Sequence, residues 1–485
     1  MGNFWNSVVS FSLLATVCLS SAVTHRVRTS SGLIEGHASP QRPGVSEFLG
    51  IPYAQPPTGA LRFARPVADC PANTGTTAED YPGFTPQGRH IVQAFAQQLG
   101  TSQSEDCLCL NVWTGQSVSN QPKPVLVWIH GGRFTIGGSN SPYYDGQVLA
   151  DEQDVVVVTF NYRMNIFGFP GAPTLPQNIG LLDQRLAIEW VHRNIAAFGG
   201  DPSRITIFGQ SAGGASVDYY TYAWRENPLV SGLISHSGTA LSFQPNTPEE
   251  SKGYFDQVVE AVGCGDEESE GAVECLRGKP YQEILQAVAK VKPAESPALP
   301  QPVFHPTVDG PYLLTNNNNE AGYYRVSAFG ANVSLTDHQW DQFNLAAFTC
   351  PTGATARSRA AHGVPTWQLR YFGDWDTLRL YPTSGAYHGV DLPMVFGTAS
   401  KVSGLPSERK EERFAKYMAA AWVAFARDPE EGLARFGWPK FTPDGNTLVG
   451  LATGNSTQPR FFRQAEFEQG CAALGGDTTP GKGAF

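Results

Sequence analysis

Beyond its first 22 residues, the sequence contains no apolar run long enough to form a membrane-spanning helix. It also lacks a Pro- or Ser-rich linker, a block of like charges and an internal repeat, any of which would suggest a division of the 485-residue chain. No group of cysteines and histidines has the spacing of metal ligands, so we expect neither a metal nor another cofactor. Acidic residues are dispersed and give a formal net charge of −10, which argues against nucleic acid as a partner. These absences predict one large domain over residues 23–485, without stable membrane insertion.

The N-terminal segment has a different character. Its apolar run, Phe11-Ser-Leu-Leu-Ala-Thr-Val-Cys-Leu19, is too short to span a bilayer and is followed by the small residues Ser20-Ser21-Ala22. This order is typical of a secretory signal peptide, here residues 1–22, with cleavage after Ala22. We therefore expect a secreted, soluble protein.

Secretion makes disulfide bonds possible for the eight cysteines. Cys18 leaves with the signal peptide, so seven remain (8 − 1), which is an odd number. The sequence alone does not determine how they pair. The pairings that we consider are Cys70–Cys107, which closes a long loop, Cys264–Cys275, which closes a short one, and Cys350–Cys471, with Cys109 left as a buried, inert thiol.

Two Asn-x-Ser/Thr sequences fit the same secretory route. They are Asn332-Val-Ser334 and Asn455-Ser-Thr457. Because this triplet is the acceptor for N-glycosylation in secreted proteins, we expect Asn332 and Asn455 to carry glycans.

The segment from Ile205 to Gly214 carries the strongest chemical signal in the chain. Ile205-Thr-Ile-Phe208 has the composition of a buried strand, and Gly209-Gln-Ser-Ala-Gly213 matches Gly-x-Ser-x-Gly at the start of an expected helix. A sharp turn between strand and helix needs small neighbours, and it lifts the serine hydroxyl above the sheet beside a helix N-terminus. We therefore predict that Ser211 is a nucleophile; the alternative is an ordinary glycine-rich loop.

A pair of glycines follows another expected strand. Val125-Leu-Val-Trp-Ile129 is an apolar run of the kind that is buried on both faces of a sheet, and His130-Gly-Gly-Arg-Phe134 comes next. Backbone amides after such a strand can bind the oxyanion of acyl transfer without reorganisation. Gly131 and Gly132, with the amide of Ala212 after the serine, are the predicted oxyanion hole; an ordinary tight turn is the alternative.

Four motifs can be taken together: Gly50-Ile-Pro-Tyr-Ala54, Glu105-Asp-Cys-Leu-Cys-Leu-Asn-Val112, the His-Gly-Gly loop and Phe208-Gly-Gln-Ser-Ala-Gly-Gly214. In combination they resemble type-B carboxylesterases, the α/β-hydrolases that include cholinesterases and large fungal lipases and esterases. The resemblance extends from about residue 26 to residue 441. It implies carboxylic ester hydrolysis and an α/β fold, with a mostly parallel, doubly wound sheet, helices on both faces and large insertions. The alternation of expected strands and helices agrees with parallel crossovers.

The general base must be one of ten histidines. His388 follows the expected strand Trp367-Gln-Leu-Arg-Tyr-Phe372 and lies downstream of the serine, as the chain order serine, acid, histidine of this fold requires. It also occupies the position that the resemblance implies for the catalytic histidine. We predict that His388 takes the Ser211 proton and returns it to the leaving alcohol. The alternatives, each expected to be a surface or loop residue, are His305, His338 and His362.

The acid of the triad is less evident. Family members carry it as Asp-Glu-Gly after a strand, and Asn318-Asn-Glu-Ala-Gly322 matches this pattern with two substitutions. Glu320 is therefore predicted to orient His388 and to stabilise the imidazolium; a solvated glutamate in a polar loop is the alternative. Asp309, in Thr307-Val-Asp-Gly310, also has the right order and is the second candidate.

The segment before Glu320 is shorter than the resemblance implies. Only Pro311–Asn319 separates Val-Asp-Gly from Glu320, which leaves no room for the usual apolar strand. The asparagines Asn316–Asn319 are poor strand formers. We therefore expect either that Val303–Val308 supplies this strand or that Glu320 lies in a loop away from His388, in which case catalysis would be impaired.

The substrate is indicated only as a carboxylic ester, of a small molecule or of a lipid. No tryptophan lies between Cys70 and Cys107, where cholinesterases hold the choline cation, so a choline ester is not expected. The presence of Ser211 argues against a purely adhesive role, which some family members have. Apolar residues recur at roughly helical spacing within residues 70–107 and could form either a lipase lid or a helix packed on the protein itself: Ile91, Val92, Phe95 and Leu99. The oligomeric state is not indicated.

Overall fold

The computed structural model describes residues 25–65, 85–95, 104–116, 121–242, 246–265, 269–291, 313–330 and 333–474. Several residues named in the sequence-based predictions fall outside these ranges: the signal peptide (1–22), Cys70, Leu99, Val303–Val308 with His305, Asp309 and Asn332. Among the described helices, none is both long and apolar enough to cross a membrane.

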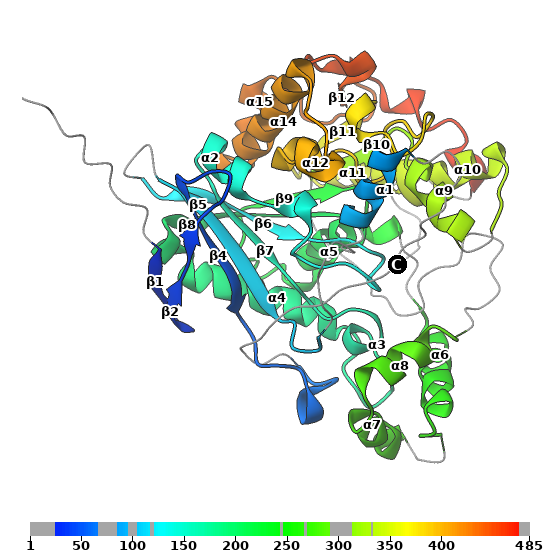
Figure 1. Ribbon diagram of the computed structural model, residues 1–485. Helices are drawn as coiled ribbons and strands as arrows, with labels where there is room; N and C mark the ends of the chain where they lie inside the picture. The colour runs from blue at the N-terminus through cyan, green and yellow to red at the C-terminus, as the bar shows by residue number, and fades with distance from the viewer. Residues whose placement is uncertain are drawn as a thin grey trace, which may run out of the picture.

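A sheet of 11 strands forms the centre of the described fold (Figure 1), in the order β13-β12-β11-β10-β9-β8-β6-β7-β5-β4-β3. From β12 through to β7 each neighbouring pair is parallel, whereas β13 at one edge and β5, β4 and β3 at the other are antiparallel. This is the predicted mostly parallel α/β sheet. The strands are β3 (His37–Ala38), β4 (Val45–Pro52), β5 (Cys109–Gly115), β6 (Lys123–Ile129), β7 (Val156–Phe160), β8 (Gly200–Gln210), β9 (Gly232–His236), β10 (Leu313–Asn317), β11 (Trp367–Tyr371), β12 (Leu448–Leu451) and β13 (Arg460–Phe462), with a separate hairpin of β1 (Arg26–Thr29) and β2 (Gly32–Glu35).

Helices cover both faces of this sheet. Figure 1 shows α4 on one side and α14 with α15 on the other, while α6, α7 and α8 gather beyond the sheet. The helices are α1 (Pro86–Phe95), α2 (Gln147–Gln153), α3 (Asn165–Gly168), α4 (Ile179–Asn194), α5 (Ala212–Ala223), α6 (Pro248–Ala261), α7 (Ser269–Arg277), α8 (Tyr281–Val288), α9 (Ala321–Gly330), α10 (Asp337–Asn344), α11 (Cys350–Ala361), α12 (Leu392–Phe396), α13 (Ala399–Ser403), α14 (Arg409–Arg427) and α15 (Gly432–Phe436).

Strand β6 shows why an uninterrupted apolar run forms a central strand. All seven of its residues are buried. Because successive side chains of a strand point to opposite faces, Val125, Val127 and Ile129 join the core on the α4 side. Leu126 and Trp128 join the core on the α14 side. The strand therefore ends, fully enclosed, at the point where the glycine loop begins.

Strand β10 corrects the prediction for the segment before Glu320. Residues Leu313–Asn317 form this strand and pair in parallel with both β9 and β11. The prediction that Val303–Val308 supplies the strand is therefore wrong, and residues 303–308 lie outside the described residues. Leu313–Thr315 pair with strands on both sides, and Asn316 and Asn317 pair with β11. This context outweighs the low intrinsic strand propensity of the two asparagines.

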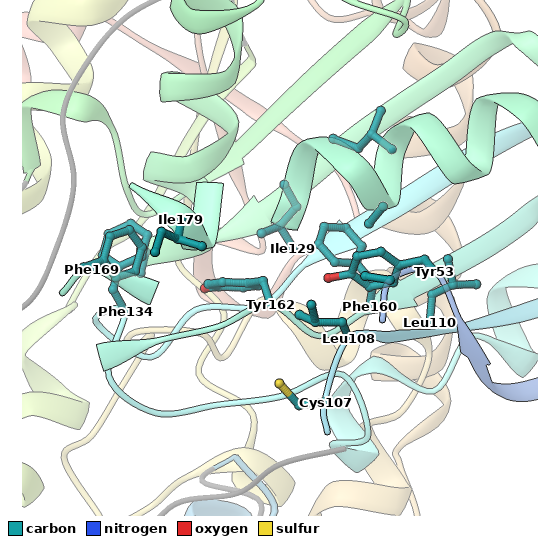
Figure 2. Packing of buried hydrophobic residues seen from close by; sticks show 14 of the residues in the cluster. Tyr53, Cys107, Leu108, Leu110, Ile129, Phe134, Phe160, Tyr162, Phe169 and Ile179 are labelled. Carbon is teal, nitrogen blue, oxygen red and sulfur yellow. The ribbon is translucent and has the colours of Figure 1, made fainter. Parts of the chain in front are cut away.

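The disulfide predictions have mixed outcomes. The structure contains the Cys264–Cys275 bond and the Cys350–Cys471 bond. Cys107 is a buried thiol beside Leu108 in the core (Figure 2), with no bonded partner among the described residues; Cys70 lies outside them, so the Cys70–Cys107 bond stays a prediction. Burial raises the pKa of the Cys107 thiol and raises that of Cys109 to about 11. Both thiols therefore stay protonated and unreactive at neutral pH, as predicted for Cys109.

Removing the Cys350–Cys471 bond is expected to destabilise the fold more than removing the shorter one. The bond spans 121 residues, against 11 for Cys264–Cys275. In the chain-entropy description these loops correspond to about 5 and about 3 kcal/mol of unfolding free energy. Thermal unfolding of the two double-serine variants checks this order. An equal or larger loss of Tm for the Cys264–Cys275 variant would contradict it.

Candidate active site

The turn between β8 and α5 places Ser211 at the top of the sheet. Ser211 has φ 56° and ψ −120°, a left-handed backbone conformation that is unusual for a residue other than glycine. Its amide donates to the carbonyl of His236 at 2.8 Å, and its own carbonyl accepts from the Ala215 amide at 2.9 Å. The strained turn is therefore held from both sides, and α5 begins directly behind the hydroxyl.

The glycines around Ser211 are required by close backbone packing. A Cβ atom on Gly213 would lie 2.0 Å from the Ile129 carbonyl oxygen, and one on Gly209 would lie 2.4 Å from the Gly213 carbonyl oxygen. Neither position can hold a larger side chain without movement of the backbone. This explains the Gly-x-Ser-x-Gly pattern physically, as a tight crossing of two chain segments.

Glu320 and His388 form a buried hydrogen-bonded pair. Glu320 follows β10, and His388 lies in the loop before α12; the exposed fractions of their side chains are 1% and 3%. The distance from His388 Nδ1 to Glu320 Oε2 is 2.7 Å. The second carboxylate oxygen accepts from the Ser237 hydroxyl at 2.8 Å and from the Asn317 amide. The expectation that Glu320 hangs away from His388 is therefore wrong, because β10 carries it to the imidazole.

The other ring nitrogen of His388 has contacts that the sequence analysis missed. Gln210 Nε2 lies 2.8 Å from His388 Nε2, and the Tyr324 hydroxyl lies 3.3 Å from it. Burial raises the pKa of Tyr324 to about 12, so its hydroxyl stays protonated; the nearby Ser211 acts on this pKa in the opposite direction. Among the described residues, no hydrogen bond runs directly from Ser211 to His388, and Tyr324 lies next to both. In the sequence, only their positions could have indicated these contacts: Gln210 directly precedes Ser211, and Tyr324 lies one helical turn after Glu320.

The glycine loop borders Ser211 directly. A Cβ atom on Gly131 would lie 3.0 Å from Ser211 Cβ and 2.4 Å from the Gln210 carbonyl oxygen. Gly132 has φ +113°, and a Cβ atom there would lie 1.9 Å from the Ile136 carbonyl oxygen. Ala212 is the first residue of α5, immediately after the serine. The three predicted oxyanion-hole residues thus belong to two segments that meet at Ser211.

His130 supports this loop without carrying charge. It is fully buried, and its ring stacks on Tyr162 with the centroids 4.5 Å apart. Burial lowers the pKa of His130 to about 4. The ring is therefore neutral near pH 7, where Nδ1 lies 2.9 Å from the Gly131 carbonyl oxygen. The Tyr162 hydroxyl donates to the His130 carbonyl at 2.8 Å. This hydrogen bond holds the start of the glycine loop against Tyr162.

The comparison of sequences decides the family. Residues 23–324 and 330–469 match the carboxylesterase family. The chain belongs to the carboxylesterase family. It is accordingly a carboxylic ester hydrolase with an α/β-hydrolase fold, as the resemblance of its motifs implies.

Several relatives cover most of this carboxylesterase-family chain. Secreted lipase 5 of Gibberella zeae is 34% identical, over 90% of this chain and 91% of the relative. Chlorogenic acid esterase of Aspergillus niger is also 34% identical, over 92% of this chain and 88% of the relative. Acetylcholinesterase of Bungarus fasciatus is 31% identical, over 90% of this chain and 85% of the relative. Their names include a lipase, an esterase and a cholinesterase, so similarity by itself does not select one substrate.

A second buried histidine–carboxylate pair, His236 and Asp391, lies next to the pair of His388 and Glu320. His236 Nδ1 is 2.8 Å from Asp391 Oδ2, and the Trp422 indole donates to His236 Nε2 at 2.9 Å. The side-chain amide of Asn317 donates to the other oxygen of Asp391 at 3.0 Å. The backbone amide of Asn317 donates to Glu320. Asn317, at the end of β10, therefore joins the two pairs. An asparagine was unexpected in a strand but supplies both donors here.

Aromatic rings enclose His388 on the α9 side. The Tyr324 and Phe348 rings each lie 5.0 Å from the imidazole, measured between centroids. Phe343 packs on both of them, at 4.9 and 5.7 Å. These side chains follow Glu320 along the chain, so the same segment that supplies the acid also excludes water from its hydrogen bond with His388.

The candidate lid helix packs on the protein itself in this structure. Ile91 and Val92 of α1 are buried in the core on the α14 side, and the Ser141 hydroxyl donates to the Ala94 carbonyl at 2.8 Å. Leu99 lies outside the described residues. Of the two interpretations of this spacing, the packed helix is the one that the described part of the segment adopts.

The predicted glycan acceptor Asn455 has a structural contact. Its side-chain amide donates to the Asp374 carbonyl at 2.8 Å, and its oxygen accepts from the Asp374 amide at 2.9 Å. The side chain is half-buried. Glycosylation of Asn455 stays a prediction.

Proposed function

We propose that this chain hydrolyses carboxylic esters through an acyl-enzyme on Ser211, with His388 as general base and acid and Glu320 as the group that orients it. The observation that carries the proposal is the 2.7 Å hydrogen bond from His388 Nδ1 to Glu320, next to a serine on a strained strand-to-helix turn. A proton held on Nδ1 leaves Nε2 with a lone pair toward the serine side. An imidazole in this tautomer can accept the serine proton.

The reaction follows from these positions. Ser211 Oγ attacks the ester carbonyl carbon as its proton passes to His388 Nε2, and the carbonyl electrons move to the oxygen. Collapse of this intermediate breaks the bond to the alcohol, which leaves with the proton from Nε2. Water then attacks the acyl-enzyme by the same steps and releases the acid. Hydrogen bonds at such sites tighten when substrate binds, which would bring Ser211 directly to His388.

The oxyanion is proposed to bind the backbone amides of Gly131, Gly132 and Ala212. The closeness of Gly131 to Ser211 Cβ and the position of Ala212 after the serine support this assignment. Amides held in a buried loop need no reorganisation as charge develops on the carbonyl oxygen. The neutral His130 behind Gly131 helps to keep the loop in place.

Labelling with a fluorophosphonate tests the proposal without knowledge of the substrate. Such a reagent phosphonylates a serine only where a base activates it, so we expect rapid modification of the purified full chain. Peptide mapping should place the label on Ser211. Labelling elsewhere, or none in a folded protein that hydrolyses p-nitrophenyl butyrate, would overturn the assignment of the nucleophile.

The substrate is proposed to be a soluble ester, with a lipase as the second candidate. Burial of Ile91 and Val92 against the protein supports the first, because a lipase lid would offer such residues to lipid. The similarity to a secreted lipase favours the second. Turnover measured across the solubility limit of p-nitrophenyl butyrate separates them. A steep rise above that limit would indicate a lipase.

Secretion is part of the same proposal. The apolar N-terminal segment, the two disulfide bonds and the similarity to a secreted lipase support it. We propose that residues 1–22 are removed, that 23–485 form one catalytic domain, and that Asn332 and Asn455 carry glycans.

Replacing Gln210 with glutamate is expected to move the acid side of the kcat/KM profile to higher pH, by about one unit or more. The amide of Gln210 donates to His388 Nε2 and so favours the neutral ring that the base must have. A carboxylate at the same place would instead favour the imidazolium, which cannot accept the serine proton, so more of the enzyme is inactive at low pH. The profile with p-nitrophenyl butyrate measures this.

Gln210→Met is the matched control, because it removes the donor without adding a charge. Its profile should move to higher pH by less than that of Gln210→Glu, because losing the donor removes support for the neutral ring but adds no charge that attracts the imidazolium. An unmoved profile in Gln210→Glu would mean that residue 210 does not contact the base during turnover.

A further inference from the structure

The turn between β10 and the triad acid is held by the backbone amides of two asparagines. The Asn318 amide donates to the Tyr371 carbonyl at the end of β11, which lies beside β10 (Figure 1), at 2.9 Å. The Asn319 amide donates to the Ala386 carbonyl in the loop before α12, also at 2.9 Å. Asparagines are poor strand formers, but their amide side chains suit a turn of this kind. The short segment that ends in Glu320 is therefore bound to the chain on two sides.

Arg370 of β11 is hydrogen-bonded to this turn and to a π-helical turn, Leu345–Thr349. Its Nε donates to the Asn318 side-chain oxygen at 3.0 Å, and its Nη2 donates to the Asn318 carbonyl at 3.4 Å. Its Nη1 donates to the Thr349 hydroxyl at 3.3 Å. The Phe467 ring packs on the guanidinium, with 4.8 Å between the guanidinium carbon and the ring centroid. Contacts with three separate segments thus fix the position of the guanidinium.

This guanidinium is a buried cation. Arg370 is 7% exposed, and within the part of the chain that the structure describes it forms no ion pair with a carboxylate. Burial lowers the pKa of Arg370 to about 10, so the side chain stays charged near pH 7, and the charge of Glu320 acts on this pKa in the opposite direction. A buried charge is strongly disfavoured unless another group compensates it. Arg370 and Glu320 therefore stabilise each other across the turn.

Both segments that bind the guanidinium also reach His388. Asn318 precedes Glu320 by two residues, and Glu320 hydrogen-bonds His388 Nδ1. Thr349 follows Phe348, whose ring lies 5.0 Å from the imidazole, measured between centroids. Turns of π-helix are frequent at functional sites. Loss of the guanidinium would release both segments and leave the charge of Glu320 without its nearby cation.

We propose that Arg370 is a positioning residue of the catalytic triad, which holds Glu320 ionised and in place for His388. This inference rests on the proposed function and adds a residue to it. The planar guanidinium suits the role because its fixed set of donors can bind two segments at once. A carboxylate held in this way keeps its hydrogen bond to Nδ1 while the ring becomes an imidazolium. Arg370 acts through Glu320 and not on the ester.

A double-mutant cycle with Glu320 tests the proposal. Arg370→Met should lower kcat for p-nitrophenyl butyrate by about 10- to 100-fold, in the range of coupling between neighbouring groups, and should change KM much less. In the Glu320→Gln background the same substitution should cost no more than about threefold, because no carboxylate is left for the guanidinium to hold. Steady-state kinetics of the wild type, the two single variants and the double variant measure the difference.

Two further variants keep the test valid where Arg370→Met destabilises the fold. Arg370→Lys keeps the positive charge, so its kcat should lie above that of Arg370→Met. Asn318→Ala removes the acceptor and leaves the arginine in place. It should also lower kcat, and this loss should likewise shrink in the Glu320→Gln background.

Arg357→Gln is the matched control. Arg357 lies on α11 and forms an ion pair with Glu468 at 2.6 Å, next to the Phe467 ring that covers Arg370. The substitution loosens the same C-terminal segment but removes no contact of Asn318 or Glu320. We expect it to lower Tm and to leave kcat close to that of the wild type.

Four results would overturn the inference. The first is a loss in Arg370→Met, or in Asn318→Ala, that is equally large with and without the Glu320 carboxylate. The second is a loss confined to KM, and the third is an equal loss in Arg370→Lys and Arg370→Met. The fourth is a similar loss of kcat in Arg357→Gln, which would assign the effect to packing of the C-terminal segment. Fluorophosphonate labelling of the wild type separates these results from a failure of the proposed function, since it needs an activated Ser211 whatever the role of Arg370.

Discussion

Ser211→Ala is expected to lower kcat for p-nitrophenyl butyrate by about 10⁴- to 10⁶-fold and to abolish fluorophosphonate labelling. The reason is that no acyl-enzyme can form without Oγ, so only binding and the oxyanion amides remain to favour the reaction with water. Stability should be little changed, because alanine has the size of serine without the hydroxyl and the strained turn is held by backbone hydrogen bonds.

Circular dichroism and thermal unfolding of Ser211→Ala are the controls for folding. Any wild-type enzyme that contaminates the Ser211→Ala preparation would react with the fluorophosphonate. Comparing the residual activity with the labelled fraction, calibrated on a wild-type sample, therefore excludes contamination as its source. Activity of the variant within tenfold of the wild type, at unchanged stability, would show that Ser211 is not the nucleophile.

Glu320→Gln is expected to lower kcat by about 10⁴-fold, the size of the effect of the corresponding change in the serine-protease example. The amide has nearly the shape of the carboxylate but can donate to Nδ1 of His388. This moves the ring proton to Nε2, which then cannot accept the serine proton. Steady-state kinetics near neutral pH measure the loss, and it should appear in kcat more than in KM.

Asp391→Asn is the matched control for this prediction. Asp391 is also buried and also accepts from a histidine Nδ1, but that histidine, His236, contacts Trp422 and not Tyr324. We expect this variant to lower Tm while costing far less in kcat than Glu320→Gln. Equal losses of kcat in the two variants would mean that the effect arises from disturbed packing and not from the orientation of His388.

The Glu320 prediction also shows where reasoning from sequence stopped. The sequence named Glu320, and its carboxylate does contact His388. The strand that carries Glu320 was not foreseen, since it was expected at Val303–Val308 or not at all. Strand propensity is a weak guide for a segment such as Leu313–Asn317, because pairing on two sides decides whether it forms.

Cysteine pairing illustrates the same limit. Cys264–Cys275 joins the turn after α6 to α7, so a short separation in sequence was sufficient to indicate it. The pairing of Cys107 with Cys70 stays a prediction, because Cys107 is buried beside Leu108 and Cys70 lies outside the described residues; no pattern of cysteines reports which way a side chain points.

The sequence by itself determined the parts of this protein that depend on local chemistry. A run of β-formers, a turn that only small residues can make, and two glycines after a buried strand place Ser211, Gly131 and Gly132 directly after β8 and β6, because each requirement is met within a few residues. Only the tertiary structure decided which groups meet His388. Gln210 and Tyr324 come from segments distant from His388 in the chain, and their contacts with it depend on how β8, β10 and the loop after β11 are placed side by side. Such contacts arise from packing of the whole sheet, and no short stretch of sequence encodes them.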